Sequence, residues 1–373
     1  MLLKNQIAAH SNAAFPNARS PLVWQMHRHA LSLFNAGAPN SNVQSSVQWL
    51  QGVDGPERAD FLIHHGLAAW WADRLADQSA LDNISNDVSE TLVAARRTAS
   101  VFYMMQSAAL SQITSALDRE NVIYAVLKGA ATREEAYPSP PLRTAGDIDV
   151  LISRNAFAAA TECITQLGFV AQSSDSTHEI TFSRGQVDID LHWDILRPGR
   201  TRKPLVGSLL ARRVLGSKFW RLSDSDTVFM MLVHPAITKY VCARKMRLNR
   251  VLDFLLFTKT RSIDWDNVAQ RLDEAGLKTA GWCTLRWIQL LVPDALILPA
   301  SFMVMIQPGK LRAVYLNYWI DHDLPGRLFD RASWLIQAAF TLPMHDKFSD
   351  ARRAVRARVS RESNRVAANV PVE

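Results

Sequence analysis

The sequence has little cysteine. Its 373 residues include three, Cys163, Cys242 and Cys283. No pair has the Cys-x-x-Cys or Cys/His spacing of a zinc site, and so small a number disfavours a disulfide scaffold. We therefore expect three buried thiols in a reducing compartment, the cytoplasm.

Long apolar runs are also missing. Met1 to Ser20 lacks the apolar stretch of a signal peptide, so we expect a loose tail there. The stretch from Trp287 to Ile306 is the most apolar, but Pro293 and Pro299 interrupt it. A spanning helix needs about 20 mainly apolar residues, so we expect buried helices instead.

No strong compositional bias is present. Apolar residues make up 48% and charged residues 21%, which excludes wholesale disorder and collagen and favours a folded protein of two or three domains. The net charge of +7 allows an anionic partner. Nucleic acid is not favoured, because no ordered basic patch with interleaved aromatic residues is visible. Part of the excess charge lies near the C-terminus, in Arg352, Arg353, Arg356, Arg358, Arg361 and Arg365.

Changes in the pattern of apolar residues along the sequence divide the chain into five parts. Helix-spaced apolar residues occupy the front and the rear, and a segment with β-prone runs lies between them. We read Trp70 and Trp71 in the front part as core or groove lining rather than a base-stacking platform. The predicted parts are a tail (1–20), a helical region (21–120), an α/β core (121–220), a second helical region (221–350) and a basic tail (351–373).

The middle segment carries the strands. Val122 to Lys128 is an apolar, β-prone run, and Gly129 to Tyr137 reads as a short helix that prolines end. Asp147 to Ile152 alternates polar and apolar residues, as a strand does. Further strands are expected at Phe169 to Gln172, His178 to Ser183 and Val187 to Trp193, the last two joined by a tight turn at Arg184-Gly185.

Two of these strands present acidic faces. Side chains alternate along a strand, so Asp147 and Asp149 share one face. By the same rule Asp188, Asp190 and His192 share a face of the later strand, and the opposite face of each strand is apolar. If the strands are neighbours, three or four carboxylates converge, and their repulsion calls for a cation. Magnesium, which prefers oxygen ligands, fits this set and indicates phosphate chemistry.

The motifs together resemble a known superfamily. Leu127-Lys128-Gly129-Ala130, Arg143-Thr-Ala-Gly-Asp147-Ile-Asp149 and Val187-Asp-Ile-Asp190-Leu-His192-Trp193 occur in this order. The set resembles the polymerase-β-type nucleotidyltransferases and, more narrowly, a bacterial branch of nucleotidyltransferase family proteins. The resemblance covers roughly Ala59 to Asp294 and implies an α+β fold, a small mixed sheet flanked by helical regions.

The resemblance also implies roles for residues. Asp147, Asp149 and Asp190 would be the catalytic carboxylates and would bind two Mg²⁺ ions, with Mn²⁺ as a substitute. The reaction would move a nucleoside monophosphate from a nucleoside triphosphate such as ATP to a hydroxyl of a small molecule, peptide or protein, releasing pyrophosphate. Residues expected to contact the nucleotide are Lys128, Gly129, Ala130, Arg143 and His192, with Arg133 as an alternative forked cation.

The chain departs from the superfamily pattern in one place, and several readings stay open. The usual Gly-Ser pair appears as Gly129-Ala130, so phosphate would depend on backbone amides at the helix start. His192 either orients Asp190, touches a ligand or is structural, and Asp188 is expected to face solvent. Packing or capping roles are expected for His234, Asp253 and Trp265. Two other functions compete with the enzyme: a catalytically silent binding module of the same fold, and a toxin-like nucleotidyltransferase that modifies RNA.

Overall fold

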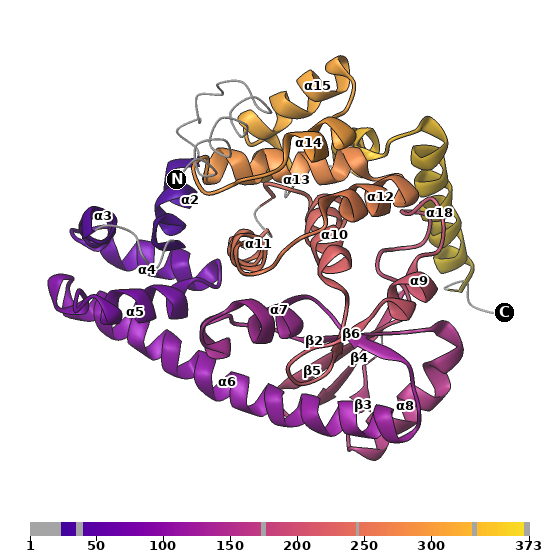
Figure 1. Ribbon diagram of the computed structural model, residues 1–373, viewed down its shortest axis with the longest axis horizontal. Coiled ribbons are helices and arrows are strands. Elements are labelled where there is room, and N and C mark those ends of the chain that lie inside the picture. Colours follow the sequence, from indigo (N-terminus) through magenta and orange to yellow (C-terminus); the bar gives the residue numbers. More distant parts are fainter. Residues whose placement is uncertain (1–23, 35–39, 173–176, 244–245, 330–333, 369–373) are drawn as a thin grey trace.

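A computed structural model describes residues 24–34, 40–172, 177–243, 246–329 and 334–368 (Figure 1). One mixed β-sheet of seven strands is enclosed by helices, which confirms the predicted α+β fold with helical flanks. The strands are β1 (Tyr124–Val126), β2 (Ile148–Ile152), β3 (Val170–Ala171), β4 (Glu179–Arg184), β5 (Val187–His192), β6 (Val214–Leu215) and β7 (Trp220–Arg221).

The helices precede, interrupt and follow the sheet segment. Those before the sheet are α2 (Gln25–Ala30), α3 (Asn40–Leu50), α4 (Gly55–His64), α5 (Ala68–Asp77) and α6 (Asn86–Arg119). Those within it are α7 (Lys128–Ala136), α8 (Phe157–Gln166) and α9 (Val206–Ala211). Those after it are α10 (Asp224–His234), α11 (Asn249–Thr260), α12 (Trp265–Ala275), α13 (Lys278–Leu291), α14 (Ala300–Ile306), α15 (Lys310–Asp321), α16 (Leu324–Leu328), α17 (Trp334–Thr341) and α18 (Phe348–Ala368).

The order of strands in the sheet is β3-β4-β5-β2-β1-β7-β6. At its centre β2 pairs in parallel with β5, and β1 pairs antiparallel with β2. The strands β4 and β5 form the expected hairpin, in which Gly185 takes a positive φ of 60° at the turn. The short strands β6 and β7, which the sequence analysis does not anticipate, extend the far edge.

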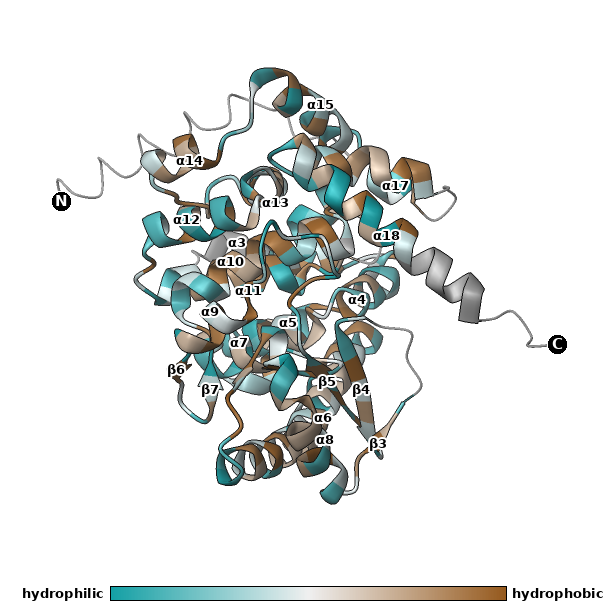
Figure 2. Cartoon of the chain, turned by 90° about the vertical axis from the view of Figure 1, so that its right-hand side faces the viewer, coloured by the Kyte–Doolittle hydropathy of each residue, from teal (hydrophilic) through white to brown (hydrophobic). Residues whose placement is uncertain are grey.

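Alternation along the central strands separates two faces of the sheet. Ile148, Val150 and Ile152 of β2 join Ile189 and Leu191 of β5 in a buried core beneath the sheet. Helices α6 and α8 cover this face in both views (Figures 1 and 2). The opposite face lies toward α7, α10 and α11 and carries the acidic residues. The sequence therefore places its polar strand positions on a face that the helical regions enclose.

The long helix α6 links the front helices to the sheet. Its buried residues recur at helical spacing, and the second half of the helix joins the core beneath the sheet. The front helices pack on its first half, where Trp70 and Trp71 are 2% and 0% exposed. Their indole nitrogens donate hydrogen bonds to backbone oxygens of Leu33 and Ala30, so both tryptophans are core residues.

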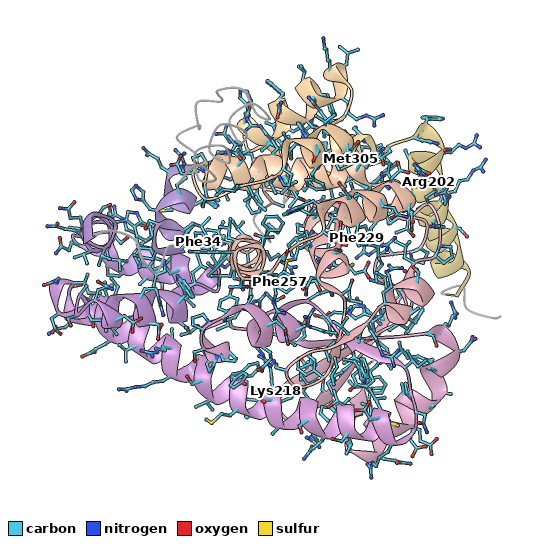
Figure 3. All side chains as sticks on the ribbon, viewed as in Figure 1. Phe34, Arg202, Lys218, Phe229, Phe257 and Met305 are labelled. Carbon is cyan, nitrogen blue, oxygen red and sulfur yellow. The ribbon has the colours of Figure 1, made fainter. Side chains whose placement is uncertain are left out.

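The rear helices form the larger part of the main core. Helix α10 begins at a capping Ser223, and α12 begins at a capping Asp264, whose side chains accept backbone N–H groups. Phe229 of α10 and Phe257 of α11 lie in the crowded interior between these helices (Figure 3). This packing fixes α11 above the acidic face of the sheet.

Two of the predicted boundaries fall inside elements. The boundary at 220 divides β7, which pairs with β1. The boundary at 351 lies within α18, which begins at Phe348 and packs against the body of the protein. Arg202 binds Asp350 at 2.8 Å beside the start of this helix (Figure 3), and Ala354 is 3% exposed. The first turns of the basic segment are therefore part of the folded structure.

The structure can be compared with two expectations from the sequence, one about the cysteines and one about membrane-spanning helices. Cys163, Cys242 and Cys283 are free and buried. Among the described residues, no helix combines the length and apolar character needed to cross a bilayer, and the segment around Trp287 forms the end of α13, a turn and α14. The predicted tail 1–20 lies outside the described residues.

Candidate active site

The two acidic strands lie side by side. Asp149 of β2 stands directly opposite Asp190 of β5 in the parallel register. Asp149 is 2% exposed, and Asp190 is half-buried. Asp147 comes one residue before β2 and lines the same cleft. The negative charge of Asp149 raises the pKa of Asp147 to about 6, which shows how closely the carboxylates are grouped.

A lysine neutralises the most buried of these carboxylates. Lys128 Nζ lies 2.5 Å from Asp149 Oδ1. Burial opposes ionisation of Asp149, but the ammonium of Lys128 and the hydrogen bond from His192 outweigh it and hold the pKa of Asp149 well below its usual range. Burial likewise disfavours the ammonium, but the charge of Asp149 prevails and raises the pKa of Lys128. The pair is ionised, with Lys128 at the start of α7.

The hairpin β4–β5 surrounds Asp190 with polar neighbours. Thr181 donates a hydrogen bond of 2.6 Å to Asp190 Oδ1, and Ser183 donates one of 2.5 Å to Asp188 Oδ1. Burial raises the pKa of Asp190 despite the hydrogen bond from Thr181. Asp188 does not line the cleft. The two carboxylates of this strand therefore differ, and Asp190 is the one that faces the site.

Three further polar side chains, those of His178, Glu179 and His192, lie next to the acidic residues. His192 Nε2 lies 2.8 Å from Asp149 Oδ1, and His192 Nδ1 lies 3.2 Å from Glu179 Oε2. His178 Nε2 is 3.5 Å from the same Glu179 oxygen. Burial lowers the pKa of His178 to about 4, so that its imidazole is neutral at pH 7. These contacts place His192 between two carboxylates.

In the part of the chain that the structure describes, two groups of side chains are close enough to hold a metal ion. Donor atoms of Asp149, Asp190 and His192 lie within 4.8 Å of one another, and so do those of His178, Glu179 and His192. His192 belongs to both groups. The first group contains two of the three predicted metal ligands, while Asp147 stands outside it.

The start of α7 is built around Arg143. A Cβ atom on Gly129 would approach the Arg143 guanidinium to 2.7 Å, so glycine lets the helix start lie against this arginine. Arg143 donates to both carboxylate oxygens of Asp253, at 2.7 Å from Nη2 and 3.1 Å from Nε. Tyr137 donates a further hydrogen bond of 2.8 Å to Asp253. Asp253 thus holds Arg143, which lies in the loop that leads to Asp147. This role differs from the packing or capping role that the sequence predicts for Asp253.

These residues surround a cleft of about 460 Å³ between the sheet and α11. Besides the acidic residues and Arg143, its lining includes Lys128 and three further arginines, Arg197, Arg247 and Arg250. Arg197 and Arg247 are exposed to the cleft, and Arg250 lies 3.2 Å from His234 Nδ1. A small apolar pocket of about 50 Å³ adjoins it between α7 and α10, lined in part by Met230 and Met231. One wall of the cleft is therefore acidic and the other basic.

The structure brings most of the predicted residues together. Asp147, Asp149, Asp190, Lys128, Gly129, Arg143 and His192 all line the cleft. Ala130 is fully buried behind the helix start. Arg133, the alternative cation, is 1% exposed and binds Gln106, away from the cleft. Arg143 reaches the cleft with its guanidinium already bound by Asp253.

Other residues of the site are absent from the prediction. Glu179 could have been found, because the predicted hairpin turn places residue 179 opposite residue 192. Arg197, Arg247 and Arg250 come from a loop after β5, from the segment before α11 and from α11. No local motif marks them, since their proximity depends on how the rear helices pack over the sheet.

Comparison with known families agrees with this geometry. The family model described as "uncharacterised nucleotidyltransferase" matches residues 52–293. The chain belongs to this family. The match begins before α4 and ends after α13, so it includes the whole sheet and the helices on both sides of the cleft. No curated protein matches the chain. Membership supports an enzyme of the nucleotidyltransferase class that uses a nucleotide substrate.

Proposed function

We propose that this protein is a divalent-metal-dependent nucleotidyltransferase that moves a nucleoside monophosphate from a nucleoside triphosphate to a hydroxyl group. The observation that carries the proposal is the register of β2 and β5, which sets Asp149 opposite Asp190. These carboxylates face a cleft whose other wall is basic. A triphosphate with its metal ions has the charge distribution that such a cleft accommodates.

The residues present fit a hard divalent cation. Asp149 and Asp190 offer adjacent carboxylate oxygens, and Asp147 lies on the same side of the sheet. The close ammonium of Lys128 shows that this cluster already requires positive charge. Mg²⁺ ions held by Asp147, Asp149 and Asp190 would stabilise the charge that develops on the phosphates, and Mn²⁺ would substitute.

The residues of the opposite wall orient the triphosphate. Gly129 at the start of α7 lines the cleft, where backbone amides would bind phosphate as they do at other helix starts. Lys128 supplies a point charge, and Arg247 and Arg250 supply forked donors from the α11 side. Arg143 acts by holding the helix start in place through its bond to Asp253.

The chemistry at the α-phosphorus then follows as an in-line displacement. The acceptor oxygen forms a bond to the α-phosphorus, the bond from that phosphorus to the bridging oxygen breaks, and pyrophosphate leaves with the electron pair. The acceptor hydroxyl proton passes to Asp190, whose pKa burial raises, so that it accepts a proton more readily than an ordinary aspartate. The acceptor is a small molecule, a peptide or a protein side chain.

The experiment compares ATP labelled at the α-phosphate with ATP labelled at the γ-phosphate, in the presence of Mg²⁺ and cell extract. Nucleotidyl transfer moves the α label to an acceptor and releases pyrophosphate, and the γ label leaves with the pyrophosphate. The other nucleoside triphosphates are tested in the same way. The Asp147→Ala, Asp149→Ala double variant should abolish the transfer.

Two outcomes contradict the proposal. Transfer of the γ label would show a kinase, and equal α-label transfer by the double variant would place the reaction elsewhere. Binding of ATP without any transfer, and without dependence on Mg²⁺, would instead support a silent nucleotide-binding module.

A further inference from the structure

A second group of ligands lies beside the proposed magnesium site. His178 and Glu179 come from the start of β4, and His192 ends β5 directly opposite Glu179. Glu179 Oε2 lies 3.2 Å from His192 Nδ1 and 3.5 Å from His178 Nε2. All three donor atoms lie within 4.8 Å of one another. The two histidines are 7% and 2% exposed and the Glu179 side chain is 29% exposed, so the imidazoles are buried and the carboxylate lies at the edge of the cleft.

The contacts of His192 leave one ring nitrogen facing an unfavourable partner. Its Nε2 lies 2.8 Å from Asp149 Oδ1, which assigns the N–H to Nε2 in the neutral ring. The other nitrogen, Nδ1, is buried and makes no hydrogen bond. It then directs a lone pair at the Glu179 carboxylate. Two acceptors this close repel each other, and the repulsion is removed either by a proton on Nδ1 or by a metal ion between the two atoms.

The arrangement around His192 is the one that metal-binding histidines adopt. Such a histidine usually donates its second N–H to a carboxylate, which fixes the ring and the tautomer. Here Asp149 is that carboxylate. The remaining nitrogen is free to bind a metal together with Glu179 and His178.

The spacing and the chemistry of the donors identify the kind of ion. Ligands bound at about 2.0 to 2.1 Å in a tetrahedral site are roughly 3.3 Å apart. The two separations from Glu179 Oε2, 3.2 Å to His192 Nδ1 and 3.5 Å to His178 Nε2, match this edge length. Two imidazoles and one carboxylate suit Zn²⁺, Co²⁺ or Mn²⁺, whereas Mg²⁺ prefers oxygen ligands alone.

We propose that His178, Glu179 and His192 form a site for a divalent transition-metal ion of the Zn²⁺ class, which adjoins the proposed magnesium ligands Asp147, Asp149 and Asp190 through the contact between His192 and Asp149. All three residues line the cleft, so a fourth coordination position opens toward it. Three protein ligands with one open position are typical of catalytic rather than structural zinc sites. The open position takes water or an oxygen of a molecule bound in the cleft. This site rests on its own ligands and does not depend on the nucleotidyl transfer proposed above.

The test uses Co²⁺, because its visible absorption reports tetrahedral coordination by histidine. The full-length protein is stripped with a chelator, dialysed and titrated with Co²⁺ in the presence of excess Mg²⁺. We expect one Co²⁺ per chain with tetrahedral absorption bands that Zn²⁺ removes by competition. His178→Ala and Glu179→Gln should each weaken Co²⁺ binding at least about tenfold and abolish these bands.

Two matched variants separate this site from its surroundings. His64→Ala removes an exposed histidine from α4 and should leave the titration unchanged. Asp190→Asn removes a proposed magnesium ligand and should leave the Co²⁺ bands in place even where transferase activity is lost. The two proposals can therefore fail independently.

A measurement on the wild-type protein covers the case in which a variant does not fold. Zn²⁺ should shift the ring-nitrogen resonances of two histidines in a ¹⁵N spectrum, and these are expected to be His178 and His192. The proposal is overturned if the wild-type protein gives only octahedral Co²⁺ bands or none. It is equally overturned if folded His178→Ala and Glu179→Gln variants titrate like the wild type, or if Zn²⁺ shifts other histidines.

Discussion

Lys128 Nζ lies 2.5 Å from Asp149 Oδ1, and the lysine reaches it from a backbone conformation with a φ of +49°. Non-glycine residues take this left-handed region rarely, and it costs about 1 kcal/mol or more. The chain accepts this cost at the first residue of α7, where the carboxylates of β2 and β5 converge. Lys128 thus holds positive charge at the acidic cluster before any metal ion binds.

This contact predicts opposite effects of Lys128→Met on two ligands. Mg²⁺ alone should bind more tightly, because the ammonium no longer competes for Asp149. Mg²⁺ with ATP should bind about tenfold more weakly, because a charged hydrogen bond contributes about 1.5 kcal/mol. Calorimetric titration measures both. The control is Lys218→Met, which removes a lysine paired with Glu134 outside the cleft. Unchanged Mg²⁺ affinity in Lys128→Met would contradict the interpretation.

The strand β5 offers a comparison between two aspartates on one face. Asp190→Asn should lower the rate of pyrophosphate release at least about 100-fold, since it removes a proposed metal ligand and proton acceptor. Asp188→Asn should stay near the wild-type rate, because Asp188 binds Ser183 and does not line the cleft. Similar losses in the two variants would remove Asp190 from its proposed role.

The sequence predicted those parts of the site that depend on local patterns. Polar and apolar residues alternate in the short stretches around Asp149 and Asp190. This alternation determines which face of the sheet each side chain occupies. That the two strands are neighbours was inferred only from the resemblance of ordered motifs. The hairpin register, which places Glu179 opposite His192, also follows from the turn.

The rest of the site depends on packing between distant segments. Asp253 lies 110 positions after Arg143 in the chain, and nothing near either residue indicates their pairing. Arg197 and Arg247 reach the cleft from loops, where no periodicity exists to interpret. The strands β6 and β7 have two residues each, too short for an alternating pattern to be recognised.

The buried pair of Arg143 and Asp253 predicts a loss of stability on removing one partner. Their side chains are 9% and 8% exposed, so Asp253→Leu leaves a guanidinium buried without its carboxylate. We expect the free energy of unfolding to fall by about 3 to 5 kcal/mol. The double variant Arg143→Met, Asp253→Leu should lose less than the sum of the two single variants, as measured by urea denaturation. Additive losses would show that the two side chains do not interact.

Two exposed arginines, Arg197 and Arg247, line the cleft. Removing either of them should weaken nucleotide binding. Arg197→Ala and Arg247→Ala should each weaken the binding of Mg²⁺ with ATP about five- to tenfold, and the dependence of affinity on salt should decrease. Arg119→Ala, an exposed arginine at the end of α6, serves as the control. Equal affinities in all three variants would mean that the triphosphate lies elsewhere.

A pair of histidines on the front helices predicts sensitivity to acid. His27 of α2 and His65 after α4 have ring centroids 5.5 Å apart, and His65 Nδ1 accepts the backbone N–H of Leu248. Burial lowers the pKa of His27 to about 4 and that of His65 to about 3. The pair connects the front helices to the segment that leads into α11.

The sign of the effect follows from these shifts. Well above pH 6.5 both histidines are neutral in the folded and unfolded chains, and their contribution to stability is complete. As the pH falls from about 6.5 toward 4, the unfolded chain takes up protons that the folded chain refuses, so the free energy of unfolding decreases. The raised pKa of Asp147 acts in the opposite direction, because the folded chain then binds the extra proton.

The variant His27→Phe isolates one histidine from these opposing contributions. Phenylalanine keeps the ring contacts with Trp24 and Phe61 but does not titrate. The wild-type protein should lose about 1.6 kcal/mol more than the variant between pH 6.5 and pH 5, since one proton corresponds to about 1.4 kcal/mol per pH unit and the unfolded histidine is half protonated at pH 6.5. Urea denaturation at the two pH values measures the difference. All other titrating groups are common to both proteins, so parallel pH profiles would mean that His27 accepts a proton in the folded state.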